Sequence, residues 1–441
     1  MLGLSVEKLT DLVHSCGDFQ TAGSLRSSQG VISATLDAKV GELCQIFTST
    51  DESVLAEAIG FRDGMSLLLP LEPCENLRVG APVYGLGRQP RVPAGKGLLG
   101  RVIDGLGTPI DGKGPLQCRR SVLANSPAPQ PLERSRICEQ LVTGVRAIDA
   151  LIALGRGQRM ALMAGSGVGK STLLGEIAKG SHADINVVAL IGERGREVKP
   201  FLEDCLGPEG LAKSVVVVAT AEQQPLVRVR AMYAALAIAH DFRDAGLDVL
   251  LMLDSITRFA TSQREIGLLL GEPPTMRGYT PSVFQSMARV LEQMGTSENG
   301  SITGLISVLV DGDDFNEPIA DCTRSIVDGH IVLDRKLAEH GHFPAINIAR
   351  SLSRTYREVT DAAMQQAATQ VRDSLATYAE VEDLLRIGAY RTGTSFRIDK
   401  AVNMKSAIDR FVKQPSGDFT SLDETKRRLG ELASQWTDAK S

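Results

Sequence analysis

The sequence has few aromatic residues and no excess of basic residues. Phe, Tyr and Trp together make up 4% of the 441 residues, and the formal net charge is −5. Proteins that bind nucleic acid usually carry basic surfaces that neutralise phosphates and aromatic rings on which bases stack. The composition therefore argues against nucleic acid as a partner.

The cysteines show no pattern of a disulfide framework or a metal site. They are scattered and odd in number, and no two have the Cys-x-x-Cys spacing of zinc or redox sites. We therefore expect reduced, buried thiols at all seven positions, which are Cys16, Cys44, Cys74, Cys118, Cys138, Cys205 and Cys322.

Long apolar runs are also missing. No run approaches the roughly 18 residues of a membrane span, and the N-terminus lacks the basic flank and long apolar centre of a signal peptide. We therefore expect a cytoplasmic protein.

The chain is long enough for two or three domains, since one hydrophobic core seldom serves 441 residues. Residues 23–91 hold short apolar runs broken by Gly, Asp and Pro, which is typical of a small closed β-domain. Residues 92–350 begin with a Gly- and Pro-rich connecting passage and then alternate strand and helix patterns, which predicts an α/β core with a mostly parallel sheet. Residues 351–441 have helical periodicity. Residues 1–22 form a separate segment, either a short amphipathic helix over residues 5–13 or a frayed terminus.

One stretch has the order of a phosphate-binding loop. In "MALMAGSGVGKSTLLGEIAKG", residues 160–180, a predicted strand leads into a glycine-rich loop and then a helix, so backbone N–H groups converge on phosphate oxygens. Lys170 adds charge for the β- and γ-phosphates, and the Ser171 hydroxyl suits Mg²⁺. The consensus begins with Gly where this chain has Ala164, a small residue as well. The expected phosphate-binding residues are Gly165, Ser166, Gly167, Val168, Gly169, Lys170, Ser171 and Thr172.

Two further predicted strands end in charged residues. "VVALIGERGRE" ends with Glu193, Arg194 and Glu197, and "DVLLMLDSITRFA" places Asp254 directly after a buried strand. Functional groups gather at the carboxyl edge of an open parallel sheet. Asp254 is interpreted as the Walker B carboxylate that holds Mg²⁺ through water, although an acid after a strand is often only a helix N-cap.

These motifs carry a resemblance. With "GEPPTMRGYTPSVF" and "PAINIARSLSR", the chain is identified as a member of the rotary-ATPase superfamily, and within it resembles the ATPases of type III protein export, particularly that of the flagellum. The resemblance covers nearly the whole chain. It implies a RecA-like P-loop core between an N-terminal β-barrel and a C-terminal helical domain, assembled as a homohexamer with ATP sites between protomers.

The resemblance also implies residue roles. Glu193 is similar to the glutamate that polarises the attacking water, Arg194 to a γ-phosphate contact, and Glu197 to a residue that supports the Mg²⁺ shell. Arg354 matches an arginine finger that reaches the neighbouring protomer's nucleotide, with a surface arginine as the alternative. Phe343 matches an aromatic face for adenine, with a core phenylalanine as the alternative.

The implied work is Mg²⁺-dependent ATP hydrolysis that energises export of flagellar proteins. The implied partners are export substrates and their chaperones, a regulatory protein at residues 1–22, and an export apparatus at the cytoplasmic face of the inner membrane. "GAYRTGTSF", residues 388–396, replaces the acidic element of rotary β-subunits, which disfavours coupling to a proton-driven rotor.

Three alternatives stay open. The homologous ATPase of a virulence injectisome would have the same chemistry. A Rho-like RNA helicase shares the core, but residues 23–91 hold only Phe47, Phe61 and Tyr84 as aromatics. A purely structural nucleotide-binding ring component is the third.

Overall fold

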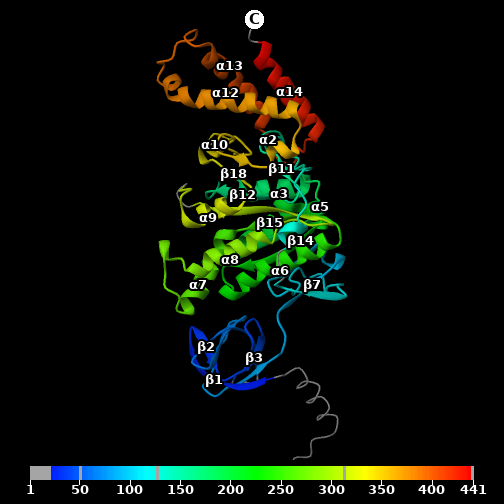
Figure 1. Ribbon diagram of the computed structural model, residues 1–441, viewed down its shortest axis with the longest axis vertical. Coiled ribbons are helices and arrows are strands. Elements are labelled where there is room, and N and C mark those ends of the chain that lie inside the picture. Colours follow the sequence, from blue (N-terminus) through cyan, green and yellow to red (C-terminus); the bar gives the residue numbers. More distant parts are fainter. Residues whose placement is uncertain (1–20, 49–51, 126–128, 311–313, 439–441) are drawn as a thin grey trace, which may run out of the picture.

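The computed structural model describes residues 21–48, 52–125, 129–310 and 314–438. A small barrel, a central α/β part and a group of long helices follow one another along the longest axis, in chain order (Figure 1). The segment over residues 5–13 lies outside the described residues. The division into domains at residues 22, 91 and 350 stays a prediction.

The N-terminal part is a closed barrel, as the alternation of apolar runs and turn residues predicted. Its strands lie in the order β1-β2-β5-β4-β3-β6, and β1 also pairs with β6, so no strand edge is left open. The barrel interior is filled by small and medium side chains such as Ala56, Cys44 and Leu68. The strands are β1 (Thr21–Gln29), β2 (Val31–Ala34), β3 (Leu43–Phe47), β4 (Ser53–Arg62), β5 (Met65–Pro70) and β6 (Pro82–Gly85).

The connecting passage carries more structure than its composition indicated. β7 (Arg91–Ala94) pairs with β9 (Arg120–Leu123), and the 3-10 turns η1 (Lys96–Leu98) and η2 (Pro131–Glu133) lie nearby in the chain. Between them β8 (Arg101–Asp104) pairs in parallel with β14 (Ser214–Thr220) and forms one edge of the central sheet. The interpretation of this passage as a plain connection was therefore wrong at β8, a strand too short to stand out beside its glycines.

The central sheet is mostly parallel, with strand order β19-β18-β12-β17-β15-β13-β14-β8; β16 pairs antiparallel with β17 and β19 antiparallel with β18. Its further strands are β12 (Arg159–Ala164), β13 (Ile185–Glu193), β14 (Ser214–Thr220), β15 (Asp248–Asp254), β16 (Gly295–Thr296), β17 (Ser301–Leu309), β18 (Gly329–Val332) and β19 (Leu352–Ser353). A separate pair is β10 (Gln140–Leu141) with β11 (Leu154–Gly155).

Helices cover both faces of this sheet (Figure 1), which explains the unbroken apolar runs of its strands. Alternate residues of β13 belong to different cores: Val187 and Ala189 to one, Val188 and Leu190 to the other. The first core takes residues of α6 (Pro225–Asp244), α7 (Ile256–Leu269), α8 (Pro281–Glu292) and α9 (Pro318–Ile326). The second takes residues of α2 (Arg146–Leu151), α3 (Lys170–Gly180) and the π-helical η3 (Phe201–Leu206). Shorter turns are α4 (Gly195–Pro200), α5 (Gly207–Ala212), η4 (Met276–Gly278) and α10 (Arg335–Glu339).

The C-terminal part is helical, as predicted, apart from the two-residue β19 after residue 350. It comprises α11 (Tyr356–Val359), α12 (Ala362–Arg386), α13 (Phe396–Val412) and α14 (Leu422–Asp438). Arg146 on α2 is 4% exposed and fastens this part to the core by donating to the carbonyls of Phe411 (3.0 Å) and Lys413 (2.6 Å) and to Thr420 Oγ1 (2.9 Å). The Gly417 N–H donates to Glu176 on α3 at 2.7 Å, which holds the loop between α13 and α14 close to α3.

The cysteines of the described segments are all free, but most are not fully buried. Cys44 is buried in the barrel; Cys138 is exposed in the passage before β10; the others, Cys74, Cys118, Cys205 and Cys322, are partly exposed. The prediction of buried thiols is therefore confirmed for Cys44, wrong for the exposed Cys138 and only partly met by the four others, while Cys16 lies outside the described residues. No helix within the described ranges is both long and apolar enough to cross a bilayer.

Candidate functional site

The phosphate-binding loop occupies the carboxyl end of β12. The strand ends at Ala164 and α3 begins at Lys170. Gly167 and Gly169 have φ of 77° and 88°, a region that residues with a side chain rarely adopt, so the turn depends on glycine. Val168 is 2% exposed and anchors the loop in the core. No side chain of the described residues caps α3, so the first N–H groups of the helix are available to an anion.

Three charged side chains meet beside this loop. Lys170 Nζ forms an ion pair with Asp254 Oδ1, at the end of β15, and lies 3.7 Å from Glu193 Oε1, at the end of β13. Ser307 on β17 donates to Asp254 Oδ1 at 2.6 Å. The ends of β12, β15 and β13 thus bring together the charged groups that the sequence placed separately at strand ends, with Ser307 of the intervening β17 beside them.

Glu193 is the least satisfied of these groups. Its Oε1 atom is buried without a hydrogen-bond partner among the described residues. Burial, and after it the negative charge of Asp254, raise the pKa of the Glu193 carboxyl, while Lys170 and Arg258 oppose the shift. A carboxylate with unused acceptor capacity beside a phosphate-binding loop is suited to orient a water molecule and to take its proton.

The two other residues of the "GERGRE" motif lie further out. Arg194 and Glu197 pair with each other, Nη1 to Oε1 at 3.6 Å, and their side chains are 63% and 48% exposed. Within the described residues, neither forms a hydrogen bond or ion pair with Lys170 or Asp254. Arg258, four residues after Asp254, also lies near Glu193: it packs against Gly192, where a Cβ would come within 2.8 Å of the Arg258 Cβ. Its spacing from Asp254 was the available signal.

A cavity of about 570 Å³ opens beside the loop, between α3 and the segment joining α13 to α14. Phe343 lines it and is 47% exposed as a residue, and a Cβ at Gly169 would lie 3.5 Å from its ring. The lining also includes Gln414, whose N–H donates to the Phe343 carbonyl at 3.0 Å, and Phe419, both of which sequence reasoning missed. No spacing links Phe419 to the loop, because Arg146 and the C-terminal helices bring it there only in the folded chain.

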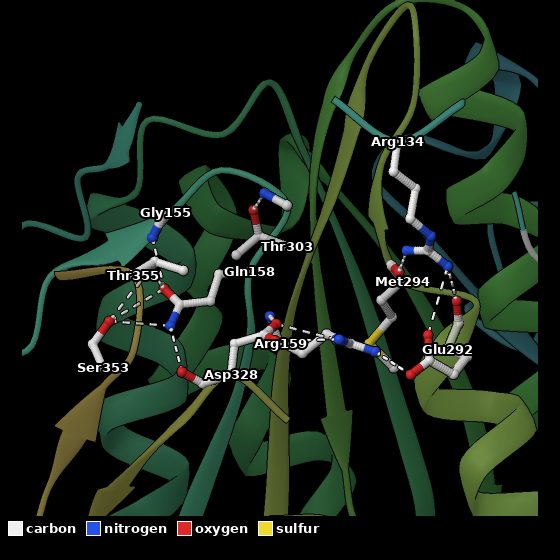
Figure 2. Close-up of polar contacts among 11 residues, drawn as sticks. Arg134, Gly155, Gln158, Arg159, Glu292, Met294, Thr303, Asp328, Ser353 and Thr355 are labelled. Carbon is white, nitrogen blue, oxygen red and sulfur yellow. Dashed lines mark hydrogen bonds and ion pairs between the residues drawn. The ribbon is translucent and has the colours of Figure 1, made fainter. Parts of the chain in front are cut away.

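Arg354 lies at the opposite edge of the sheet. It follows β19, and its N–H donates to the Asp328 carbonyl at 2.9 Å. Asp328 lies just before β18 and pairs with Arg159 at the start of β12 (Figure 2). Lys170 follows the other end of β12. A six-residue strand separates these edges, roughly 17 Å at the usual rise per residue. The structure therefore does not bring Arg354 to the Lys170 site of its own chain.

The donor set suits a magnesium ion that is held partly by a nucleotide. Among the described residues no cluster of three or more His, Cys, Asp or Glu could hold a metal alone. Mg²⁺ keeps several waters and is usually bound through one or two protein oxygens together with substrate phosphates. The exposed hydroxyl of Ser171 at the loop and the carboxylate of Asp254 fit that requirement.

Comparison with protein families defines the class. Residues 144–353 match the nucleotide-binding domain of the ATP synthase alpha/beta family, and residues 360–431 match the C-terminal domain of the type III secretion ATPase EscN. With the phosphate-binding loop and the mostly parallel sheet, these matches define a P-loop ATPase.

Known proteins narrow the class. The flagellum-specific ATP synthase of Bacillus subtilis is 45% identical over 97% of this chain and 99% of its own length. The type 3 secretion system ATPase of Xanthomonas euvesicatoria is 46% identical over 90% of each chain. The assembled ATPase EscN of the enteropathogenic E. coli type III secretion system has a TM-score of 0.87 and 40% identity, covering 93% of this chain and all (100%) of that one. The chain therefore belongs to the family of flagellum-specific and type III secretion ATPases, and it is an ATPase of type III export.

Proposed function

We propose that the chain is a Mg²⁺-dependent ATPase that works as a homohexamer, with sites between protomers, and energises export of flagellar proteins. The observation that carries the proposal is that two sets of charged residues lie far apart within one chain. Lys170, Glu193 and Asp254 gather at the carboxyl edge of the sheet, whereas Arg354 lies at the amino edge. A second protomer is then required to bring an Arg354 side chain beside the γ-phosphate.

In this proposal the loop N–H groups and Lys170 bind the ATP phosphates, and the cavity beside Phe343 receives the adenine. Ser171 and Asp254 hold Mg²⁺, which neutralises charge on the phosphates when bound. The Glu197 carboxylate supports this ion through water.

Glu193 orients the attacking water and takes its proton, and Arg194 contacts the γ-phosphate. Arg354 of the neighbouring protomer stabilises the charge that develops on the transferred group, which elsewhere is worth roughly 10³ to 10⁵ in rate. The desolvated position of Glu193 supports its role, because its charge is then poorly screened.

The homologues support assembly and partners. EscN, the ATPase of the type III secretion system, has been solved in an assembled form and in complex with its central stalk EscO. We propose likewise a ring with a stalk-like partner, and a regulatory protein at residues 1–22. Its cargo is export substrates with their chaperones, handled in the cytoplasm by a ring bound peripherally to an export apparatus at the inner membrane.

The test is complementation between two inactive variants. Lys170→Ala destroys the phosphate site of its own protomer but keeps Arg354, and Arg354→Ala does the reverse. Each variant alone is expected to lose turnover. Rings assembled from a mixture of the two regain activity, since an intact phosphate site then meets an intact arginine. A mixture no more active than the sum of its parts would contradict a site shared between protomers.

The second candidate is the same enzyme in a virulence injectisome. Its support is specific, since the Xanthomonas secretion ATPase is as similar in identity, 46%, as the Bacillus flagellar protein, 45%. Deleting the gene in its host separates the two: loss of motility and of flagellin export supports the flagellar assignment, and loss of injected effectors with normal motility supports the other.

A further inference from the structure

A fully buried glutamine stands at the start of β12, directly before the strand that leads to the phosphate-binding loop. Gln158 is 0% exposed. Its Oε1 accepts from the Gly155 N–H and from Thr355 Oγ1, both at 2.8 Å. Its Nε2 donates to Ser353 Oγ at 3.0 Å and to the Asp328 carbonyl at 3.2 Å (Figure 2). Every donor and acceptor of the amide is thus used.

The orientation of this amide is fixed by partners with only one possible role. The Gly155 N–H can only donate, and the Asp328 carbonyl can only accept. In a reversed amide, the NH₂ group would face the Gly155 N–H, donor against donor, and the oxygen would face the Asp328 carbonyl, acceptor against acceptor. Unmet polar groups of this kind are costly at a buried position. Gln158 therefore has a single arrangement in the fold.

The hydrogen bonds of Gln158 hold the backbone on both sides of Arg354. Ser353 and Thr355 are its two chain neighbours, and the Asp328 carbonyl that accepts from Gln158 also accepts from the Arg354 N–H, at 2.9 Å. Within the described part of the chain, no ion pair or hydrogen bond holds the exposed Arg354 guanidinium. The direction of that side chain therefore depends on the backbone to which it is attached.

Ion pairs and backbone hydrogen bonds hold Asp328, the residue whose carbonyl accepts from Gln158 and Arg354. Arg159 donates to the Asp328 carboxylate from Nε at 3.1 Å and from Nη2 at 3.2 Å, and to the Glu292 carboxylate from Nη1 at 2.7 Å. The Asp328 N–H in turn donates to the Arg159 carbonyl at 2.9 Å. Arg134 donates to the Met294 carbonyl at 2.7 Å on the same side (Figure 2). Asp328 is thus held independently of Gln158, so a change at Gln158 acts mainly on residues 353–355.

We propose that Gln158 is a positioning residue for Arg354. Its hydrogen bonds connect residues 353–355 of each protomer to β12, the strand that leads to the same protomer's phosphate-binding loop. The inference rests on the proposed function, in which Arg354 completes the neighbouring site. Each β12 would then serve two sites, its own through the loop and the next through Gln158.

The first measurement compares two buried polar residues at the same edge. Gln158→Leu keeps approximate size and removes all four hydrogen bonds. Thr303→Val is the matched control, because Thr303 is 2% exposed and accepts from the Gly157 N–H at 2.8 Å but, in the described part of the chain, forms no hydrogen bond with residues 353–355. We expect kcat of Gln158→Leu to fall roughly 10- to 100-fold with nucleotide affinity within about twofold, as for misplacement of a catalytic group. Thr303→Val should keep its turnover within about twofold.

The second measurement asks which site suffers. Mixed rings of Gln158→Leu and Lys170→Ala protomers regain activity if the defect lies in the arginine, because Lys170→Ala supplies a correctly placed Arg354 to the intact phosphate site. They stay inactive if Gln158→Leu damages its own loop through β12, and the inference is then overturned.

The Arg354→Ala and Lys170→Ala mixture separates the two failures. If that mixture is active and the Gln158→Leu mixture is not, only the positioning role falls. If neither is active, the shared site falls as well.

Thr355→Val provides a milder variant in case Gln158→Leu does not fold. It removes the bond to Gln158 Oε1 and a longer one, 3.4 Å, with Ser353 Oγ. The same pattern is expected at smaller size: a kcat decrease of about threefold to tenfold, unchanged nucleotide affinity and recovery with Lys170→Ala. Unchanged kcat in this variant, measured with thermal melting to verify the fold, would argue against the inference.

Discussion

The two ends of β12 use buried polar groups in opposite ways. At the carboxyl end, Glu193 Oε1 lacks a hydrogen-bond partner among the described residues and the N-terminus of α3 is uncapped. At the amino end, Gln158 makes all its hydrogen bonds, and Arg159 and Asp328 satisfy each other in two ion-paired bonds. Six residues of one strand separate the two arrangements.

This difference in hydrogen bonding indicates a different role for each end of β12. Buried polar groups that keep bonding capacity cost stability and are retained where a ligand supplies the missing partner. Fully bonded networks hold one geometry and leave nothing for a ligand. The carboxyl end is therefore arranged for binding and chemistry, and the amino end for position. Substitutions at the two ends should separate activity from stability.

The largest effect is expected at the carboxyl end. Glu193→Gln keeps the shape of the side chain and removes the base, so turnover should fall roughly 10²- to 10⁴-fold while nucleotide binding persists. Because burial and Asp254 raise the pKa of the Glu193 carboxyl, its charge costs folding free energy, and the variant should melt at a higher temperature than the wild type. Steady-state kinetics, a nucleotide-binding assay and thermal melting measure the three. Retained turnover would remove Glu193 from the chemistry.

An intermediate effect is expected at the amino end. Asp328→Ala removes the partner of an Arg159 side chain that is 16% exposed, which should cost about 2–3 kcal/mol and lower the melting temperature. Glu382→Ala is the control, since its pair with Arg386 is 43% and 63% exposed and should contribute less than about 0.5 kcal/mol. Equal shifts in the two variants would show that the amino-end network is no more than a surface ion pair.

The carboxyl end was largely predictable from sequence. The run from Asp248 to Asp254 coincides with β15, because unbroken leucine and β-branched residues mark a strand covered on both faces. Since parallel strands end at one edge, the sequence alone predicts that Glu193 and Asp254 lie near Lys170. The glycine positions of the loop likewise follow from local geometry alone.

The amino end was not predictable in the same way. In "GRGQR" Gln158 has the composition of a surface turn, and its partners Asp328 and Ser353 lie 170 and 195 residues further along the chain. No local period encodes contacts of that length. The short β8 and the cavity residue Phe419 were missed for the same reason, since tertiary pairing alone gives them their place.

The smallest expected effect is a change of stability with pH. It tests whether the amino end is a structural network. His240 on α6 donates through Nε2 to the Gln293 carbonyl at 3.0 Å, beside the Met294 carbonyl that accepts from Arg134. Burial, and after it the charge of Arg243, lower the pKa of His240 to about 4, with Asp244 opposing and Arg134 adding to the shift.

An unfolded histidine titrates near 6.5, so this contribution to stability is complete above about pH 6.5 and is lost as pH falls towards 4. Between about pH 7.5 and pH 5 the loss should be about 1–2 kcal/mol. His240→Gln keeps a donor for the Gln293 carbonyl and cannot titrate, so its melting temperature should fall less over that interval than that of the wild type. Parallel pH profiles of the two proteins would mean that His240 already titrates normally and that the amino end is open to water.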